Sequence, residues 1–214
     1  MTERLHFENR QAWLRNRKRG IGASESAAAA GLNPAYSRMK LWRLKTGQAE
    51  DEDLSENELV QRGVRMEPVL RAWFIANHPE LTVEHYPYDM LYQTERPWLY
   101  ATLDGEVTVN ATGESGVLEI KTAEPRGRDG WAEWDGQIPQ KYYCQLLHQY
   151  LATGRKHFWL IAALYSQNGD VTIREYHIEA DENFRADAQW LLEAETLCWD
   201  CVERRLPPPT PITF

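Results

Sequence analysis

The chain has 214 residues and a formal net charge of −8, and 43% of its residues are hydrophobic. This apolar content can build a core and excludes a disordered chain. The length predicts a single domain over residues 1–214, with a Pro-rich tail at about 207–214. No apolar run is long enough to cross a bilayer, and three cysteines suit a reducing compartment, so we expect a soluble, cytoplasmic protein with no membrane partner.

Charge is segregated along the chain. Residues 10–20 hold five basic residues and no acid, whereas residues 50–58 hold six acids and no base. An acidic chain is not expected to coat nucleic acid with its whole surface, because phosphate binding depends on lysine and arginine. A local basic segment can still hold one phosphate.

The first half of the sequence predicts helices. In chain order they cover residues 8–16, 24–31, 39–46 and 58–77. Ser24 is the expected N-cap of the second helix, and Gly31 its stop. In the longest helix, the residues at helical spacing that predict a buried stripe are Leu59, Gly63, Met66, Leu70 and Trp73.

The pattern then changes to period two. Predicted strands cover 81–88, 90–94, 99–109 and 117–122, and the last two form a hairpin. A helix at 139–152, a strand hairpin of 158–165 with 171–178, and a helix at 181–205 follow. This order predicts an α+β or mixed α/β fold, with helices on a central mixed sheet.

Three side chains that carry chemistry fall in the first hairpin. Alternation puts Glu119 and Lys121 on one strand face, and the partner strand can bring Asp104 beside them. Two carboxylates and an ammonium among apolar neighbours are costly unless something compensates them. Mg²⁺ would do so, because it takes carboxylate oxygens, a main-chain carbonyl and water. The lysine could then hold, or help to deprotonate, a water that attacks phosphorus.

A purely structural interpretation remains open and is favoured by spacing alone. Asp104-Gly105 could be a turn, and L-E-I-K could be an ordinary amphipathic strand. A third acid favours the chemical interpretation, because Glu67 lies beside the buried stripe of the long helix, where a carboxylate needs a partner.

Five sequence blocks occur in an order that is typical of one nuclease group. They run from about Trp13 to Tyr165: W-L-x-x-R with G-I-G-A-S, R-G-V-R-M-E, T-L-D-G, L-E-I-K-T and Y-Y-C-Q-L. The chain resembles the PD-(D/E)XK nuclease superfamily, and more closely the phage lambda exonuclease / YqaJ-type viral recombinase family of alkaline exonucleases. The resemblance implies a restriction-endonuclease-like core.

The resemblance also implies roles for individual residues. Asp104 and Glu119 would bind Mg²⁺, or Mn²⁺ in its place, with the carbonyl of Ile120, and Lys121 would be the catalytic lysine. Glu67 would be a further acid, acting through water or a second metal. The residues that fall on the family's 5′-phosphate pocket are Arg17, Ser24, Thr102 and Gln145. Leu103 replaces a family proline, and the family's second helical glutamine falls on Leu147.

The implied function is 5′-to-3′ exodeoxyribonuclease activity. One strand of linear double-stranded DNA would be digested to mononucleotides, leaving a 3′ single strand for recombination. The family works as a homotrimeric ring, and a phage origin and a phage-type single-strand annealing protein as partner are implied likewise. The alternatives are an endonuclease of the same superfamily and a catalytically silent DNA-end-binding module, although the latter has no need for Lys121.

For several residues, a purely structural role is an open alternative to a functional one. Ser24 could only cap a helix, Arg17 could be a solvated member of the basic run, and Gln145 could satisfy backbone groups. Trp131 and Trp134 could stack on a base or pack in the core or between subunits. Cys198 and Cys201 are expected to pack in the core, and the six histidines, which form no HxH or HxxxH pair, are interpreted as structural or surface residues.

Overall fold

The structure is a computed structural model that describes residues 1–33, 35–50, 52–54 and 56–209. Residues 51 and 55 of the acidic run, and 210–214 of the expected tail, lie outside this part. The elements are β1 (Thr2–His6), α1 (Arg10–Arg17), β2 (Ile21–Gly22), the 3₁₀ turn η1 (Ala23–Glu25), α2 (Ser26–Ala29), α3 (Arg38–Lys45), α4 (Glu58–Asn77), β3 (Leu81–Glu84), β4 (Asp89–Gln93), β5 (Arg96–Ala101), β6 (Gly105–Val109), β7 (Ser115–Ala123), α5 (Gly127–Ala132), α6 (Gln140–Thr153), β8 (His157–Tyr165), β9 (Val171–Glu179) and α7 (Glu182–Glu203).

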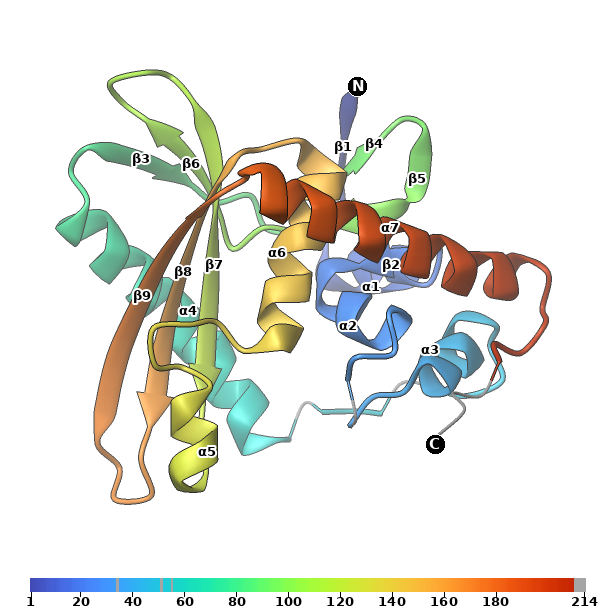
Figure 1. Cartoon of the computed structure of the whole chain (residues 1–214), viewed down its shortest axis with the longest axis horizontal. Helices are drawn as coiled ribbons and strands as arrows, with labels where there is room; N and C mark the ends of the chain where they lie inside the picture. Colours follow the sequence, from blue (N-terminus) through green and yellow to red (C-terminus); the bar gives the residue numbers. More distant parts are fainter. Residues whose placement is uncertain (34, 51, 55, 210–214) are drawn as a thin grey trace.

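The strands form two sheets, seen in Figure 1. The smaller has the order β1-β4-β5-β2, and the larger the order β3-β6-β7-β8-β9. In the larger sheet β7 and β8 run parallel, whereas its other neighbouring strands are antiparallel, so this sheet is mixed, as the sequence predicted. None of the helices in the described ranges is long and apolar enough to cross a membrane.

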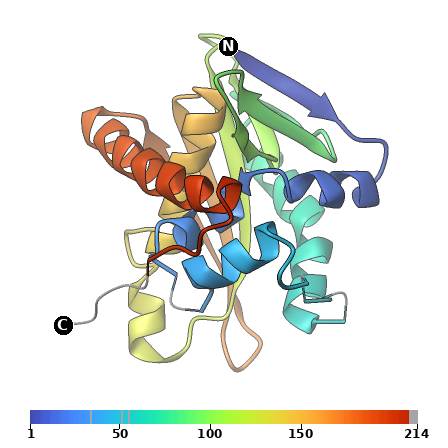
Figure 2. The same cartoon turned by 90° about the vertical axis from the view of Figure 1, so that its right-hand side faces the viewer.

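Helices cover both faces of the larger sheet. On one face, Leu70 and Phe74 of α4 pack against Leu118 and Trp159. On the other face, α6 and α7 pack against β7 and β8 through a cluster that includes Leu146 and Leu191. Figure 2 shows α4 and α7 on opposite sides of the strands. The two apolar clusters confirm the predicted α+β layering.

The predicted strand 99–109 is wrong as a single element. The chain ends β5 at Ala101 and begins β6 at Gly105, and the two strands belong to different sheets. Residues 99–101 and 105–109 do lie in strands, as the alternation predicted, but the two strands pair with different neighbours. Thr102–Asp104 is therefore the crossing between the sheets, and this crossing carries Asp104.

The first residues are also part of the fold. Thr2–His6 pairs antiparallel with β4, from Thr2 opposite Gln93 to His6 opposite Asp89. The polar composition of this segment gave no strand signal, because β1 is an edge strand with mostly exposed side chains.

Two helix predictions need correction. In α4 the buried residues are Leu70 and Phe74, whereas Leu59 and Trp73 of the predicted stripe are 51% and 40% exposed. Ser24 is not an N-cap, because it lies inside η1 and α2 begins only at Ser26. Gly31 follows α2 with φ +77°, as expected of a glycine stop.

The C-terminal half agrees closely with the sequence. Gly154 ends α6 in the left-handed region with φ 70°, and β8 and β9 form the predicted hairpin. Cys198 is buried in the core, as expected. Trp134 is 3% exposed and packs against Tyr142 and Tyr176, so core packing accounts for it and base stacking does not.

Candidate active site

The predicted site residues line one cleft of about 890 Å³. It receives side chains from α1, η1, α4, β7 and α6, and from the crossing between the sheets. All nine predicted residues line it: Arg17, Ser24, Glu67, Thr102, Asp104, Glu119, Ile120, Lys121 and Gln145. The fold thus gathers residues that are up to 128 positions apart (145 − 17) in the sequence.

Glu119 is a buried carboxylate at the centre of the cleft wall and is 1% exposed. Gln145 Nε2 donates to its Oε1 at 2.7 Å, and Gln149 Nε2 donates to its Oε2 at 2.5 Å. Lys121 forms an ion pair with the same Oε1. Three donors therefore orient a charge that would otherwise be costly to bury.

Asp104 lies at the crossing and faces the same strand. Its Oδ2 accepts a hydrogen bond from the Ile120 N–H at 2.8 Å, which ties the crossing to β7. Burial and then the negative charge of Glu119 raise the pKa of Asp104 well above its usual value. The two acids consequently compete for ionisation in the absence of an added positive charge.

Lys121 lies between the two acids and an aromatic ring. Burial lowers its pKa, but the charges of Glu119 and Asp104 outweigh burial and the pKa is raised overall. The ammonium also lies 5.2 Å from the centre of the Tyr142 ring. Lys121 is therefore protonated at neutral pH and acts as a hydrogen-bond donor and a positive charge.

Glu67 reaches the cleft from α4 as part of an ion pair with Arg71. Arg71 Nε also donates to the Asp104 carbonyl at 2.7 Å. Arg71, which was missed at the sequence level, therefore holds the crossing from the α4 side. The sequence predicted that the Glu67 carboxylate needs a partner, and this partner is Arg71. The role of Glu67 in metal binding stays a prediction.

A second group in the cleft links α1 to the crossing. Arg17 Nη2 donates to Ser24 Oγ at 3.2 Å, and its guanidinium lies 4.9 Å from the centre of the Trp13 ring. Trp13 Nε1 in turn donates to Thr102 Oγ1 at 3.0 Å. Arg17, Ser24 and Thr102 therefore form one connected group, with Trp13 as a member that only the W-L-x-x-R spacing could have indicated.

A buried lysine supports this group from behind. The side chain of Lys45 is 4% exposed, and its Nζ lies 2.7 Å from both the Arg17 carbonyl and Glu25 Oε2. Glu25 Oε2 also accepts the Gly22 N–H at 2.9 Å. The end of α1 and the η1 turn are thereby held together.

Gln145 differs from the other expected phosphate-pocket residues, because its side-chain N–H donates a hydrogen bond to the Glu119 carboxylate. Gln149, one helical turn further along α6, makes the matching bond and was missed, since the alignment of blocks put the second glutamine at Leu147. Leu147 instead packs in the core. The i, i+4 spacing of the two glutamines was the available signal.

The donor set fits a divalent cation. Asp104 and Glu119 offer hard oxygen atoms, and burial, with the charge of Glu119 second, raises the pKa of Asp104, so an added cation would stabilise its ionised form. Glu119 is already oriented by its amide donors, an arrangement common around metal-binding carboxylates.

Sequence comparison places the chain in a family. Residues 12–156 match the YqaJ-like viral recombinase domain. The chain belongs to this family. The uncharacterized protein YqaJ of Bacillus subtilis (strain 168) is 28% identical over 140 residues, which is 65% of this chain. Those residues make up 41% of that relative, so the chain spans less than half of its length.

Solved structures share the fold of this YqaJ-like chain. The alkaline exonuclease LHK-Exo of Laribacter hongkongensis is 20% identical, with a TM-score of 0.64 over 91% of this chain and 95% of its own. The structure of LHK-Exo in complex with dAMP, also 20% identical, has a TM-score of 0.61 over 91% of this chain and 97% of its own. A phage-related exonuclease of Haemophilus somnus 129PT is 10% identical, with a TM-score of 0.57 over 87% of this chain and 96% of its own. These matches confirm the predicted nuclease fold.

Neutralising Asp104 should stabilise the metal-free YqaJ-like domain. A carboxyl group whose pKa is raised by folding binds its proton more tightly in the folded state, so stability falls as pH rises above the unfolded pKa. At pH 8 with EDTA, we expect Asp104→Asn to raise the melting temperature by about 2–4 °C, the shift that 1 kcal/mol gives in a domain of this size.

The difference in melting temperature between Asp104→Asn and the wild type should shrink toward pH 4, near the ordinary Asp pKa of about 3.9. The control is Asp170→Asn, at an exposed hairpin turn. A melting temperature for Asp104→Asn at or below that of the wild type at pH 8 would contradict the electrostatic account.

Proposed function

We propose that this YqaJ-like protein is a Mg²⁺-dependent exodeoxyribonuclease that digests one strand of linear double-stranded DNA from its 5′ end. The product would be a 3′ single-stranded overhang suited to recombination. The proposal rests on one observation: Asp104, Glu119 and Lys121 share a cleft with the Arg17–Ser24 pair. The fold that the chain shares with alkaline exonucleases agrees with it.

The acids supply the metal ligands in this proposal. Asp104 and Glu119, with the Ile120 carbonyl, would hold Mg²⁺, and Mn²⁺ is expected to substitute for it. When bound, the cation would stabilise negative charge on the scissile phosphate and on the leaving oxygen. Gln145 and Gln149 keep the Glu119 carboxylate in place and so limit the reorganisation that binding requires.

Lys121 orients the nucleophile. In the metal-free site burial lowers its pKa, but the charges of Glu119 and Asp104 raise it overall, which favours the ammonium form. An ammonium fixed by Glu119 and Tyr142 can hydrogen-bond the attacking water and offset charge that develops on the phosphate.

The Arg17–Ser24 pair accounts for the 5′ polarity. A guanidinium offers paired donors to phosphate oxygens, and Ser24 adds a hydroxyl beside it. A terminal phosphate carries more negative charge than an internal diester, so this pair would bind a strand end preferentially. Because α2 is only 4 residues long, we assign it no role in phosphate binding.

Several inferences from the family resemblance stay predictions. These are the homotrimeric ring, the single-strand annealing partner and the release of mononucleotides. The segregation of charge suits a charge-lined channel within an acidic ring, because Arg10 and Arg17 of the basic segment line the cleft while the chain as a whole has a net charge of −8.

Substrate topology tests the proposal against its rivals. The protein is incubated with linear and with closed circular duplex DNA, each with Mg²⁺ and with EDTA. Loss of linear DNA alone, and only with Mg²⁺, is the expected result. Cutting of the circles would identify an endonuclease, and no digestion of either DNA would identify a DNA-end-binding module.

Removal of the Lys121 ammonium should abolish digestion. We expect Lys121→Ala to lower the rate by about 10²–10⁴-fold, the usual contribution of a group that acts on the nucleophile, with little change in DNA binding. Rates and binding are measured on the same 5′-phosphorylated duplex. The control is Lys141→Ala, because the Lys141 ammonium also lies over the Tyr142 ring, at 4.7 Å, but outside the cleft. Near wild-type digestion by Lys121→Ala would reduce the lysine to a structural role.

Removal of the Arg17 guanidinium should weaken end selection. Wild type is expected to digest 5′-phosphorylated duplex faster than 5′-hydroxyl duplex, and Arg17→Ala should reduce this ratio by about tenfold, roughly one charge-assisted hydrogen bond. The two duplexes differ only in the terminal phosphate. Arg19→Ala is the matched control, since it removes a charge from the same basic run without touching the cleft. A ratio unchanged in Arg17→Ala would leave the polarity without this explanation.

A further inference from the structure

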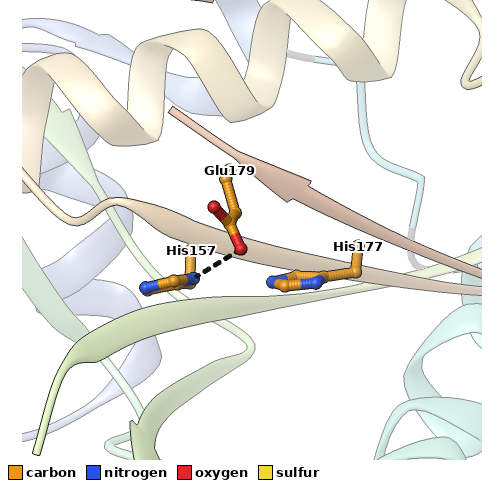
Figure 3. Close-up of side chains that lie close together, drawn as sticks. All are labelled: His157, His177 and Glu179. Atoms are coloured by element: carbon orange, nitrogen blue, oxygen red, sulfur yellow. Dashed lines mark ion pairs between the residues drawn. The ribbon is translucent and has the colours of Figure 1, made fainter. Parts of the chain in front are cut away.

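A second cluster of metal-ligating side chains lies away from the cleft. It consists of His157 on β8 and His177 and Glu179 on β9, and its ligand atoms all lie within 4.8 Å of one another (Figure 3). It occupies the α4 face of the larger sheet, the face to which Trp159 also belongs. Glu119 points to the other face, toward α6, so the two sites are separate.

Strand register brings the three residues together. His157 lies opposite Glu179 in the β8–β9 ladder, and His177 lies opposite Trp159, two residues further along. Residues two apart in a strand share a face, so the cluster follows from the pairing of this one hairpin.

Aromatic stacking holds the imidazole rings. The His177 ring stacks on the Trp159 indole at 4.5 Å and 9°, and the two histidine rings are inclined by 16° with centres 5.7 Å apart. Figure 3 shows the rings side by side, each with a nitrogen toward the other, and the Glu179 carboxylate reaching toward His157. The arrangement leaves one ligand atom of each residue within 4.8 Å of the other two.

One of those atoms has an unmet bonding capacity. His157 Nδ1 is buried and makes no hydrogen bond, and it lies 4.0 Å from Glu179 Oε1, too far for one. On the other side of the ring, Nε2 lies 3.6 Å from Glu114 Oε2. At 3.6 Å this is an electrostatic contact and not a hydrogen bond; in the neutral tautomer with the proton on Nε2, the Nδ1 lone pair faces the cluster and is available to a cation.

His177 is suited to the same role. Its exposed ring turns a nitrogen toward His157, within 4.8 Å of the other ligand atoms. The nearby carboxylate of Glu179 supplies negative charge for a cation.

We propose that His157, His177 and Glu179 form a Zn²⁺ site that joins the edge strand β9 to β8. Two imidazoles and one carboxylate favour zinc over Mg²⁺, which prefers oxygen ligands. Tetrahedral zinc, with bonds of about 2.0–2.2 Å, needs ligand atoms roughly 3.3 Å apart. The exposed side chains of His177 and Glu179 can close the remaining distance by small rotations that keep the His177 ring stacked on Trp159. The fourth position would hold water or a ligand from another molecule.

The test is metal titration of the intact protein in millimolar Mg²⁺, which occupies hard oxygen sites. Calorimetry with Zn²⁺ should give one site per chain, and Co²⁺ should give the visible absorption of an imidazole-bound ion. The double variant His177→Gln/Glu179→Gln alters exposed side chains and should fold, as circular dichroism can check. It should lose Zn²⁺ affinity by more than tenfold, whereas His6→Gln, at another exposed histidine, should not.

Two further readouts separate this site from the cleft. Zn²⁺ should raise the melting temperature of wild type and of Asp104→Asn, but not that of the double variant. The Zn²⁺ titration and the melting temperatures do not require the proposed nuclease function, and Mg²⁺-dependent digestion should be the same in the double variant as in wild type. Absence of Zn²⁺ binding, equal affinity in the double variant, or loss of Zn²⁺ binding in Asp104→Asn alone would overturn the proposal.

Discussion

Glu119 puts a carboxylate into the interior of the sheet, and a charge buried there is stable only when its oxygens are hydrogen-bonded. Gln145 and Gln149, one turn apart on α6, supply amide donors, and Lys121 supplies a charge. The helix cannot slide or rotate over β7 without leaving the carboxylate unsatisfied. One set of contacts therefore sets the position of α6 on the sheet and the orientation of the Glu119 carboxylate.

The same constraint explains why the cleft has unbalanced charge. Asp104 is held at the crossing by the Ile120 N–H and by Arg71, where burial, and then the nearby charge of Glu119, raise its pKa. A site built only for stability would replace one acid with a neutral side chain. Both acids lie beside Lys121, and their proximity is unfavourable in the metal-free protein. In the proposed function, a bound cation would offset this repulsion.

Much of the fold followed from local patterns. Helix α4 and the β8–β9 hairpin were predicted within a residue or two, because apolar periodicity over many residues and glycine or Asn-Gly turns are local signals. The failures have one cause. The split between β5 and β6, the true buried stripe of α4 and the strand β1 all depend on which distant segment packs against them. Alternation of apolar and polar residues indicates which side chains of a strand are buried, but it does not indicate with which strand it pairs.

The sequence by itself indicated nine of the residues that line the cleft, because their types and order match the blocks of the family that the chain resembles. It determined neither their contacts nor the partners that hold them. Gln145 and Gln149 on Glu119, Lys45 behind Arg17, and Arg71 on the crossing were decided only by tertiary structure. The His157–His177–Glu179 cluster is the clearest case, since its members lie up to 22 residues apart (179 − 157) and meet only through strand register. Hydrogen bonds and metal geometry act over about 2–4 Å, and chain spacing does not specify distances on that scale between separate elements.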